Sequence, residues 1–242
     1  MFFTRNIKAL ALPGWLLWPA GLAMANDYIV YSPLVVAGQN EIESRAYLNQ
    51  DGQGPGHGLW ENDVSLAHTL NSWWKTEVYV LELAGAQQTA QQRLGYEFEN
   101  TFQLAELGRY AWTPGFLLSY EKSTRASVPD HLEAGPLLER QDGRILQDLN
   151  LIWEHEISPR FAGKPGLRTS YSWHFRYTDL LQPGLEAYLR PSDQSYQLGP
   201  TLHGELPGAS GHELEYSLGV VFGCNSDAPA MTWLAHIEYE FF

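Results

Sequence analysis

Residues 231–242 read MTWLAHIEYEFF, and their alternation of apolar and polar residues is typical of the closing strand of a membrane-spanning β-barrel. Successive side chains of a β-strand point to opposite faces, so alternate residues of the stretch share one face. One face is apolar and consists of Met231, Trp233, Ala235, Ile237, Tyr239 and Phe241. The other face carries the polar residues Thr232, His236, Glu238 and Glu240. A soluble β-sheet shows the same alternation, so the number of such strands and the residues before them must separate the alternatives.

Residues 1–25 have the pattern of a secretory signal peptide. Arg5 and Lys8 precede a mostly apolar stretch, and residues 23–25, Ala-Met-Ala, form a small-x-small cleavage site. A transmembrane helix is the alternative, but prolines and glycines interrupt the apolar run, which is shorter than the roughly 20 residues that a spanning helix needs. We therefore expect export of the chain and removal of residues 1–25, which leaves a single domain at 26–242.

The composition argues against several classes of protein. Residues 1–25 hold two of the fifteen lysines and arginines and none of the twenty-eight acidic residues, so the mature chain has a formal charge of −15. We expect no nucleic-acid partner, because phosphate binding needs a basic surface. Cys224 is the only cysteine, so no internal disulfide can form. Aromatic residues make up 13% of the chain and include nine tryptophans, which is natural for a barrel with aromatic girdles at the membrane interfaces.

Period-two alternation continues along the chain and predicts twelve strands. The clearest are 93–104, 167–177 and 213–223, each of a length that crosses a bilayer when the strand is tilted. Weaker runs fill the gaps, at 40–48, 59–70, 74–83, 115–122, 132–140, 148–156, 185–190 and 196–205. With the final strand the count is even, as antiparallel closure with both ends on one side requires. The predicted fold is an all-β, closed, antiparallel transmembrane barrel with up-and-down topology, and its short loops argue against a large plug.

Two hairpins resemble each other around a Gly-Pro pair. Gly135-Pro136 and Gly199-Pro200 lie 64 positions apart, which is four predicted strands, so we expect them on strands that run in the same direction. Proline cannot donate a hydrogen bond to a ladder, and a closed barrel has no free edge to hold it. We therefore expect a bulge or a rim position at both prolines.

These features together resemble Gram-negative outer-membrane β-barrel proteins over essentially all of residues 26–242. The resemblance implies a place in the cell outer membrane, contact with membrane lipids and lipopolysaccharide, and recognition of the C-terminal strand by the outer-membrane assembly machinery. In that class the terminal aromatic residue belongs to the set of side chains that point outward. Here the outward set ends at Phe241 and Phe242 lies one residue beyond it, a departure that leaves the exact register of the last strand open. A narrower resemblance, to small and poorly characterised barrels of the transporter type, is carried by the short motifs 31–33 (Tyr-Ser-Pro), 199–202 (Gly-Pro-Thr-Leu) and 238–241 (Glu-Tyr-Glu-Phe).

If the apolar faces meet lipid, a mostly acidic set of side chains faces the lumen. It consists of Glu41, Glu43, Arg45, Glu97, Glu99, Glu121, Glu133, Glu139, Asn150, Glu154, Arg168, His174, Arg176, Glu186, Tyr188, Arg190, His203, Glu205, Glu213, Glu215, His236, Glu238 and Glu240. Twelve strands leave a bore between that of eight-stranded, side-chain-filled barrels and that of open sixteen-stranded porins. The first hypothesis is therefore a passive channel or transporter component for small solutes, favouring cations. The second is a structural or partner-anchoring barrel whose lumen is closed by ion pairs.

The sequence gives less support to catalysis or to a metal site. No Gly-x-Ser-x-Gly motif occurs, and His68 and His155 fall on the lipid-facing set, where we expect interfacial residues rather than bases. No spacing of the metal-site type links His174, His203 and His236. We expect no cofactor and no metal, and we lean against an enzyme. An outer-membrane lipid-modifying enzyme and a soluble periplasmic β-sandwich or lipocalin-like binder remain as third and fourth hypotheses.

Overall fold

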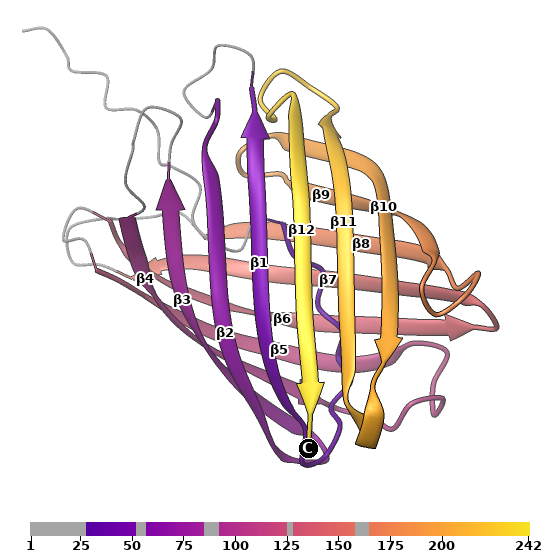
Figure 1. The fold of residues 1–242 in the computed structure, drawn as a ribbon. Helices are drawn as coiled ribbons and strands as arrows, with labels where there is room; N and C mark the ends of the chain where they lie inside the picture. The colour runs from indigo at the N-terminus through magenta and orange to yellow at the C-terminus, as the bar shows by residue number, and fades with distance from the viewer. Residues whose placement is uncertain (1–27, 52–56, 85–91, 125–127, 158–164) are drawn as a thin grey trace, which may run out of the picture.

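The chain folds into one closed barrel of twelve antiparallel strands, as predicted (Figure 1). The computed structural model describes residues 28–51, 57–84, 92–124, 128–157 and 165–242, so the expected signal peptide at 1–25 lies outside the described residues. The strands are β1 (Asn40–Gln50), β2 (Trp60–Asn71), β3 (Trp74–Ala84), β4 (Gln92–Gln103), β5 (Thr113–Ser123), β6 (Asp130–Asp142), β7 (Ile145–Ile157), β8 (Gly166–Phe175), β9 (Gln182–Arg190), β10 (Ser195–Pro207), β11 (Glu213–Gly223) and β12 (Met231–Phe241), with a short 3₁₀ turn, η1 (Ala209–Gly211), between β10 and β11.

The predicted strands differ from these bounds by at most three residues at either end. Each strand pairs with the strands before and after it, and β12 returns to pair with β1. In Figure 1 the near strands β1 and β12 cross the far strands β6 and β7 at a steep angle, as tilted strands of a barrel do.

The final strand closes the barrel. Its ladder with β1 runs without interruption from Asn40 opposite Phe241 to Gln50 opposite Met231. Phe242 follows the last pair and is exposed. The first strand therefore begins and the last strand ends at the same rim of the barrel.

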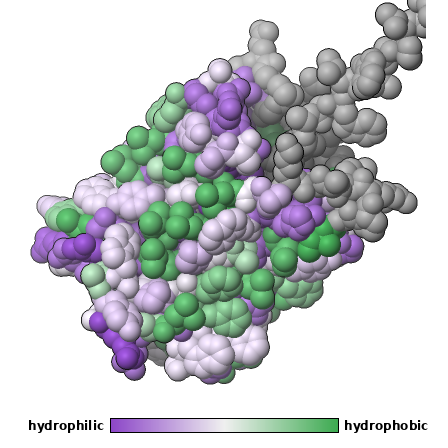
Figure 2. Space-filling model, turned by 180° about the vertical axis from the view of Figure 1, so that it is seen from behind, coloured by the Kyte–Doolittle hydropathy of each residue, from purple (hydrophilic) through white to green (hydrophobic). Residues whose placement is uncertain are grey.

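The two faces of the sheet have the polarity of a membrane barrel. Apolar side chains such as Leu66, Phe98 and Trp233 are about half exposed on the outer face, and Figure 2 shows hydrophobic side chains gathered over the barrel wall. The alternate positions, which face the interior, carry buried polar residues such as Glu61 and Glu97. A soluble β-sandwich or lipocalin-like binder has the opposite arrangement, so the structure contradicts the fourth hypothesis.

Among the described residues, no helix is long and apolar enough to cross a membrane.

The two Gly-Pro pairs lie in the middle of β6 and β10, which run in the same direction, as predicted. The expected bulge or rim position at both prolines is wrong, because the register of β6 with β7 and of β10 with β11 stays constant across them. The ladders instead skip two positions, Gly135-Pro136 in one and Gly199-Pro200 in the other. Proline has no N–H to donate, so the sheet accepts a local loss of pairing rather than a change of register.

Glycine precedes each proline because the neighbouring strand lies too close for a side chain. A Cβ atom on Gly135 would lie 1.9 Å from the Leu151 carbonyl oxygen, and one on Gly199 would lie 1.9 Å from that of Val220. The inward residues at these points, Ile152 and Val221, are fully buried. The duplicated sequence motif thus builds the same tight strand contact twice.

Replacing Gly135 with alanine is expected to lower the free energy of unfolding by about 1–3 kcal/mol, the usual cost of overpacking. Urea unfolding of the protein refolded in detergent micelles measures this change. Gly166→Ala is the matched control, since the nearest atom to its added Cβ is the Ser192 hydroxyl oxygen at 3.4 Å. Equal stability of the Gly135→Ala variant and the unmodified protein would contradict the tight strand contact.

Candidate functional site

Residues 28–39, the described residues before β1, run along the inside of the barrel. Figure 1 shows the indigo N-terminal thread passing within the ring of strands before it joins β1. Ile29 and Tyr31 pack in one buried cluster with Leu117, Leu137 and Ile152, three inward-facing residues of β5, β6 and β7. We call residues 28–39 the N-terminal segment. The short loops argue against a large plug, and the structure adds a feature that the sequence analysis did not predict, because this short segment occupies part of the lumen.

Hydrogen bonds from wall side chains hold the backbone of the N-terminal segment. The Tyr31 amide N donates to Asn150 Oδ1 at 2.7 Å, and Asn150 Nδ2 donates back to the Tyr31 carbonyl at 2.9 Å. The Val35 amide donates to Gln103 Oε1 at 2.8 Å, and Ser32 Oγ donates to Glu139 Oε2 at 2.6 Å. An extended segment away from the sheet leaves backbone groups without ladder partners, and these amide and carboxylate groups replace them.

Arg45 links the N-terminal segment to the wall of the barrel. Its guanidinium carbon lies 5.4 Å from the ring centroid of Tyr31 and 4.7 Å from that of Tyr79 on β3. The same guanidinium forms an ion pair with Glu43, with Nη2 donating to Oε2 at 2.9 Å. A cation between two aromatic rings and a carboxylate is stabilised by both kinds of contact.

A cavity of about 420 Å³ lies between the N-terminal segment and the wall. Eleven carboxylates line it: Glu41, Glu43, Asp63, Glu99, Glu139, Asp148, Glu186, Glu205, Glu215, Glu238 and Glu240. The lysines and arginines that line it are Arg45, Lys75 and Arg176. The cavity is therefore strongly acidic, and charge imbalance of this size attracts cations.

The sequence-predicted lumen residues divide between the cavity and a separate part of the interior. Those that line the cavity are Glu41, Glu43, Arg45, Glu99, Glu139, His174, Arg176, Glu186, Tyr188, His203, Glu205, Glu215, His236, Glu238 and Glu240. Those outside its lining are Glu97, Glu121, Glu133, Asn150, Glu154, Arg168, Arg190 and Glu213. The sequence analysis did not include Lys75 and Asp148 among the lumen residues, although both line the cavity. Alternation along the strand predicts that Lys75 points inward because Val78 points outward, and that Asp148 points inward because Leu149 points outward.

Carboxylates stand directly opposite one another across three strands of the wall. Glu43 on β1 is the ladder partner of Glu238 on β12, which is the partner of Glu215 on β11. Glu41 and Glu240 are paired in the same way one step along. Like charges opposite each other destabilise a sheet, so this region needs cations or protons to compensate. Lys75 Nζ donates to Glu41 Oε2 at 2.6 Å and supplies one of them.

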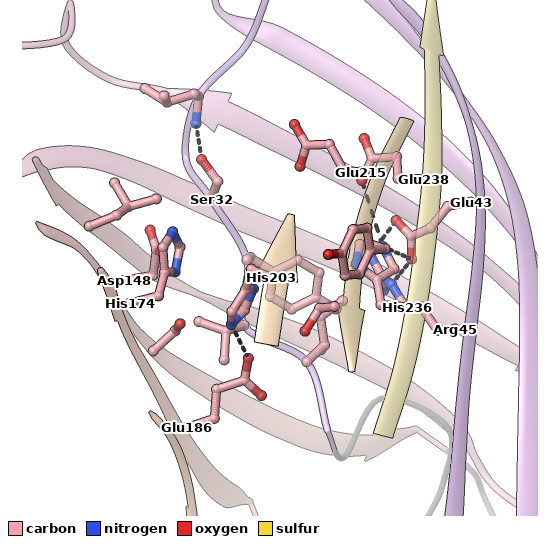
Figure 3. A pocket seen from close by; sticks show the side chains of 18 of the residues that line it. Ser32, Glu43, Arg45, Asp148, His174, Glu186, His203, Glu215, His236 and Glu238 are labelled. Carbon is pink, nitrogen blue, oxygen red and sulfur yellow. Dashed lines mark hydrogen bonds and ion pairs between the residues drawn. The ribbon is translucent and has the colours of Figure 1, made fainter. Parts of the chain in front are cut away.

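Histidines meet in the cavity although they are distant in sequence. The rings of His174 and His203 stack with centroids 4.5 Å apart, and His203 Nε2 lies 3.3 Å from Glu186 Oε1. His236 Nε2 lies 3.4 Å from Glu43 Oε1 and 3.7 Å from Glu238 Oε2 (Figure 3). One donor atom from each of Glu43, His236 and Glu238 lies within 4.8 Å of the others, a spacing that could hold a metal ion.

A second group of charged side chains forms ion pairs in another part of the interior. Arg168 on β8 is 1% exposed, and its guanidinium contacts Glu133 Oε2 at 2.7 Å and Glu154 Oε1 at 3.2 Å. Arg190 Nη2 also contacts Glu154 Oε1, at 2.9 Å. Glu133 and Glu154 are ladder partners, so Arg168 holds two opposed carboxylates together. This is the kind of ion-pair closure that the second hypothesis requires.

His68 and His155 are exposed on the outer face. His68 Nδ1 lies 2.9 Å from Asn40 Oδ1, its ladder partner at the rim where the chain enters β1. Trp74 Nε1 donates to Asn100 Oδ1 at 3.0 Å nearby on β3 and β4. Polar pairs beside tryptophan at a rim are typical of the membrane interface.

Comparison with solved structures places this architecture among known barrels. An outer membrane channel from Pseudomonas putida F1 superposes with a TM-score of 0.56 at 10% identity, covering 90% of this chain and 99% of that chain. The protein has the fold of an outer-membrane β-barrel. An anion-selective porin from Comamonas acidovorans gives a TM-score of 0.38 at 8% identity, covering 84% of this chain and 98% of that chain. No protein-family model and no curated protein matches the sequence.

Replacing Arg168 with methionine is expected to lower the free energy of unfolding by about 3–5 kcal/mol, because it leaves buried carboxylates without their cation. Adding Glu133→Gln and Glu154→Gln to this variant should restore most of the loss. Urea unfolding in micelles measures both changes. Arg140→Met is the control, since Arg140 pairs with Asp142 at an exposed position. A loss no larger than that of the control would show that the buried ion pairs do not stabilise the barrel.

Proposed function

We propose that this protein is a passive outer-membrane channel for small solutes whose lumen is narrowed by its own N-terminal segment. The observation that carries the proposal is the polar cavity of about 420 Å³ inside a barrel with an apolar exterior. A polar lumen and a lipid-facing apolar band together are the arrangement of water-filled barrels. The fold shared with a known outer membrane channel supports the same conclusion.

The proposal includes the place of the protein in the cell. Both ends of the barrel chain meet at one rim, where Asn40 pairs with Phe241. In the outer-membrane β-barrel proteins that this chain resembles, this rim faces the periplasm. The N-terminal segment would then be within reach of periplasmic solutes. Membrane lipids and lipopolysaccharide then surround the outer face, and the C-terminal strand is the element that the assembly machinery reads.

A structural barrel with a closed lumen is the second candidate, and two observations favour it. The N-terminal segment occupies part of the lumen, and the buried ion pairs of Arg168 occupy another part. The two candidates differ in one respect, which is whether solutes pass the N-terminal segment. Co-purification of a fixed partner together with no flux would favour the structural barrel.

Removal of residues 28–36 is expected to raise the single-channel conductance severalfold in planar bilayers, because the truncated chain no longer occupies the lumen. Asn150→Ala, which removes both hydrogen bonds to the Tyr31 backbone, should produce a smaller rise or more frequent open events. The shift in gel migration on heating, which folded barrels show, confirms that each variant is folded. A folded, truncated barrel without conductance would reject the channel and support the structural alternative.

The channel is expected to prefer cations, because eleven carboxylates and three lysines or arginines line the cavity. In a KCl gradient the reversal potential should have the sign of K⁺ selectivity. Glu215→Gln combined with Glu240→Gln should move this potential toward zero, whereas Glu106→Gln in the exposed loop between β4 and β5 should not. Anion selectivity of the unmodified protein would contradict the proposed role of the acidic lining.

A further inference from the structure

Several buried side chains that line the cavity have polar atoms without hydrogen-bond partners among the described residues, and three of these side chains lie on the neighbouring strands β8 and β9. The atoms of these three are Ser172 Oγ and His174 Nδ1 on β8 and Gln182 Oε1 on β9. The three residues are 3%, 7% and 1% exposed. Leaving such an atom unsatisfied destabilises the fold, because the atom has lost its hydrogen bonds to water. All three atoms can accept a hydrogen bond, so a ligand that donates hydrogen bonds would satisfy them.

Carboxylates flank these acceptors. Ser172 is the ladder partner of Asp148 on one side and of Glu186 on the other, and both carboxylates line the cavity. His174 stacks on His203, which in turn contacts Glu186. Acceptors next to carboxylates are the surroundings that an ammonium group prefers, because it has three N–H donors and a positive charge.

A second group of carboxylates lies across the cavity. Figure 3 shows Asp148 and His174 on one side of the view and Glu215, Glu238 and Glu43 on the other. Arg45 pairs with Glu43, and His236 contacts Glu43 and Glu238. Among the described residues, no lysine or arginine forms an ion pair with Glu215 or Glu238. The lining of this one cavity thus contains two separate groups of carboxylates.

We propose that this cavity binds a linear organic polyamine, with one ammonium group at the Asp148, Ser172 and Glu186 end and another at the Glu215 and Glu238 end. This rests on the proposed function, since it names the class of solute that the channel takes. A cavity of about 420 Å³ is within the size range of small-molecule sites. A single metal ion at Glu43, His236 and Glu238 is the competing occupant, but it would leave Ser172, His174 and Gln182 unsatisfied.

The test is isothermal titration of spermidine into the complete mature protein, folded in detergent micelles at moderate salt. Saturable binding of about one spermidine per chain is expected, and an equal concentration of Mg²⁺ should not displace it. Glu186→Gln should weaken spermidine binding about tenfold, a loss of one ammonium contact. Ser172→Ala should weaken binding while it leaves the charge unchanged, and Glu106→Gln should bind as the unmodified protein does.

Several outcomes would overturn the polyamine site. These are no saturable spermidine binding by the folded barrel, equal binding by Glu186→Gln, or tighter binding of Mg²⁺ or Mn²⁺ that His236→Ala abolishes. Conductance separates this inference from the proposed function. If the complete mature protein binds spermidine but the folded barrel that lacks residues 28–36 does not conduct, the polyamine site is supported and the channel is rejected. If that barrel conducts but the complete mature protein does not bind spermidine, the channel is supported and the site is rejected.

Discussion

The ring of strands must be closed, because both faces and the interior of this barrel exist only if every strand has two hydrogen-bonded neighbours. Hydrocarbon offers no partner to a backbone N–H or C=O group, so a sheet that spans a membrane cannot have a free edge. The pairing of β1 with β12 removes the last edge. Once the sheet is closed, one face meets lipid and the other meets an enclosed lumen, which is why Trp233 is exposed and Glu43 is buried.

An enclosed acidic face is electrostatically unfavourable, and the interior compensates part of it in two ways. Buried arginine compensates one group of carboxylates, as Arg168 does for Glu133 and Glu154. In the N-terminal segment, Ser32 donates a hydrogen bond to Glu139, and the Tyr31 ring contacts Arg45, which pairs with Glu43. The remaining carboxylates border the cavity with few basic partners. An acidic surface of this kind is costly to maintain unless cations occupy it, and this links the energetics of the lumen to its proposed solutes.

The N-terminal segment connects the fold to the function. Its contacts are side-chain hydrogen bonds and a small apolar cluster rather than a strand ladder, so it is held less strongly than the wall. Elements with few backbone partners open at lower free energy than the sheets around them. In the proposed channel, displacement of this segment would widen the lumen without any change in the closed ladder.

The number of strands, their approximate bounds and the polarity of their two faces could be predicted from the sequence, because side-chain direction in a strand depends only on alternate position along the chain. The sequence also placed Gly135-Pro136 and Gly199-Pro200 on strands of the same direction. Which of the inward-facing residues contact one another could not be predicted from the sequence and is seen only in the folded barrel. His236 and Glu43 are nearly two hundred positions apart and become neighbours through ring closure, and Asn150 binds Tyr31 across the lumen. These contacts depend on the register and tilt of all twelve strands, and the N-terminal segment has no period-two pattern by which its place inside the barrel could be read.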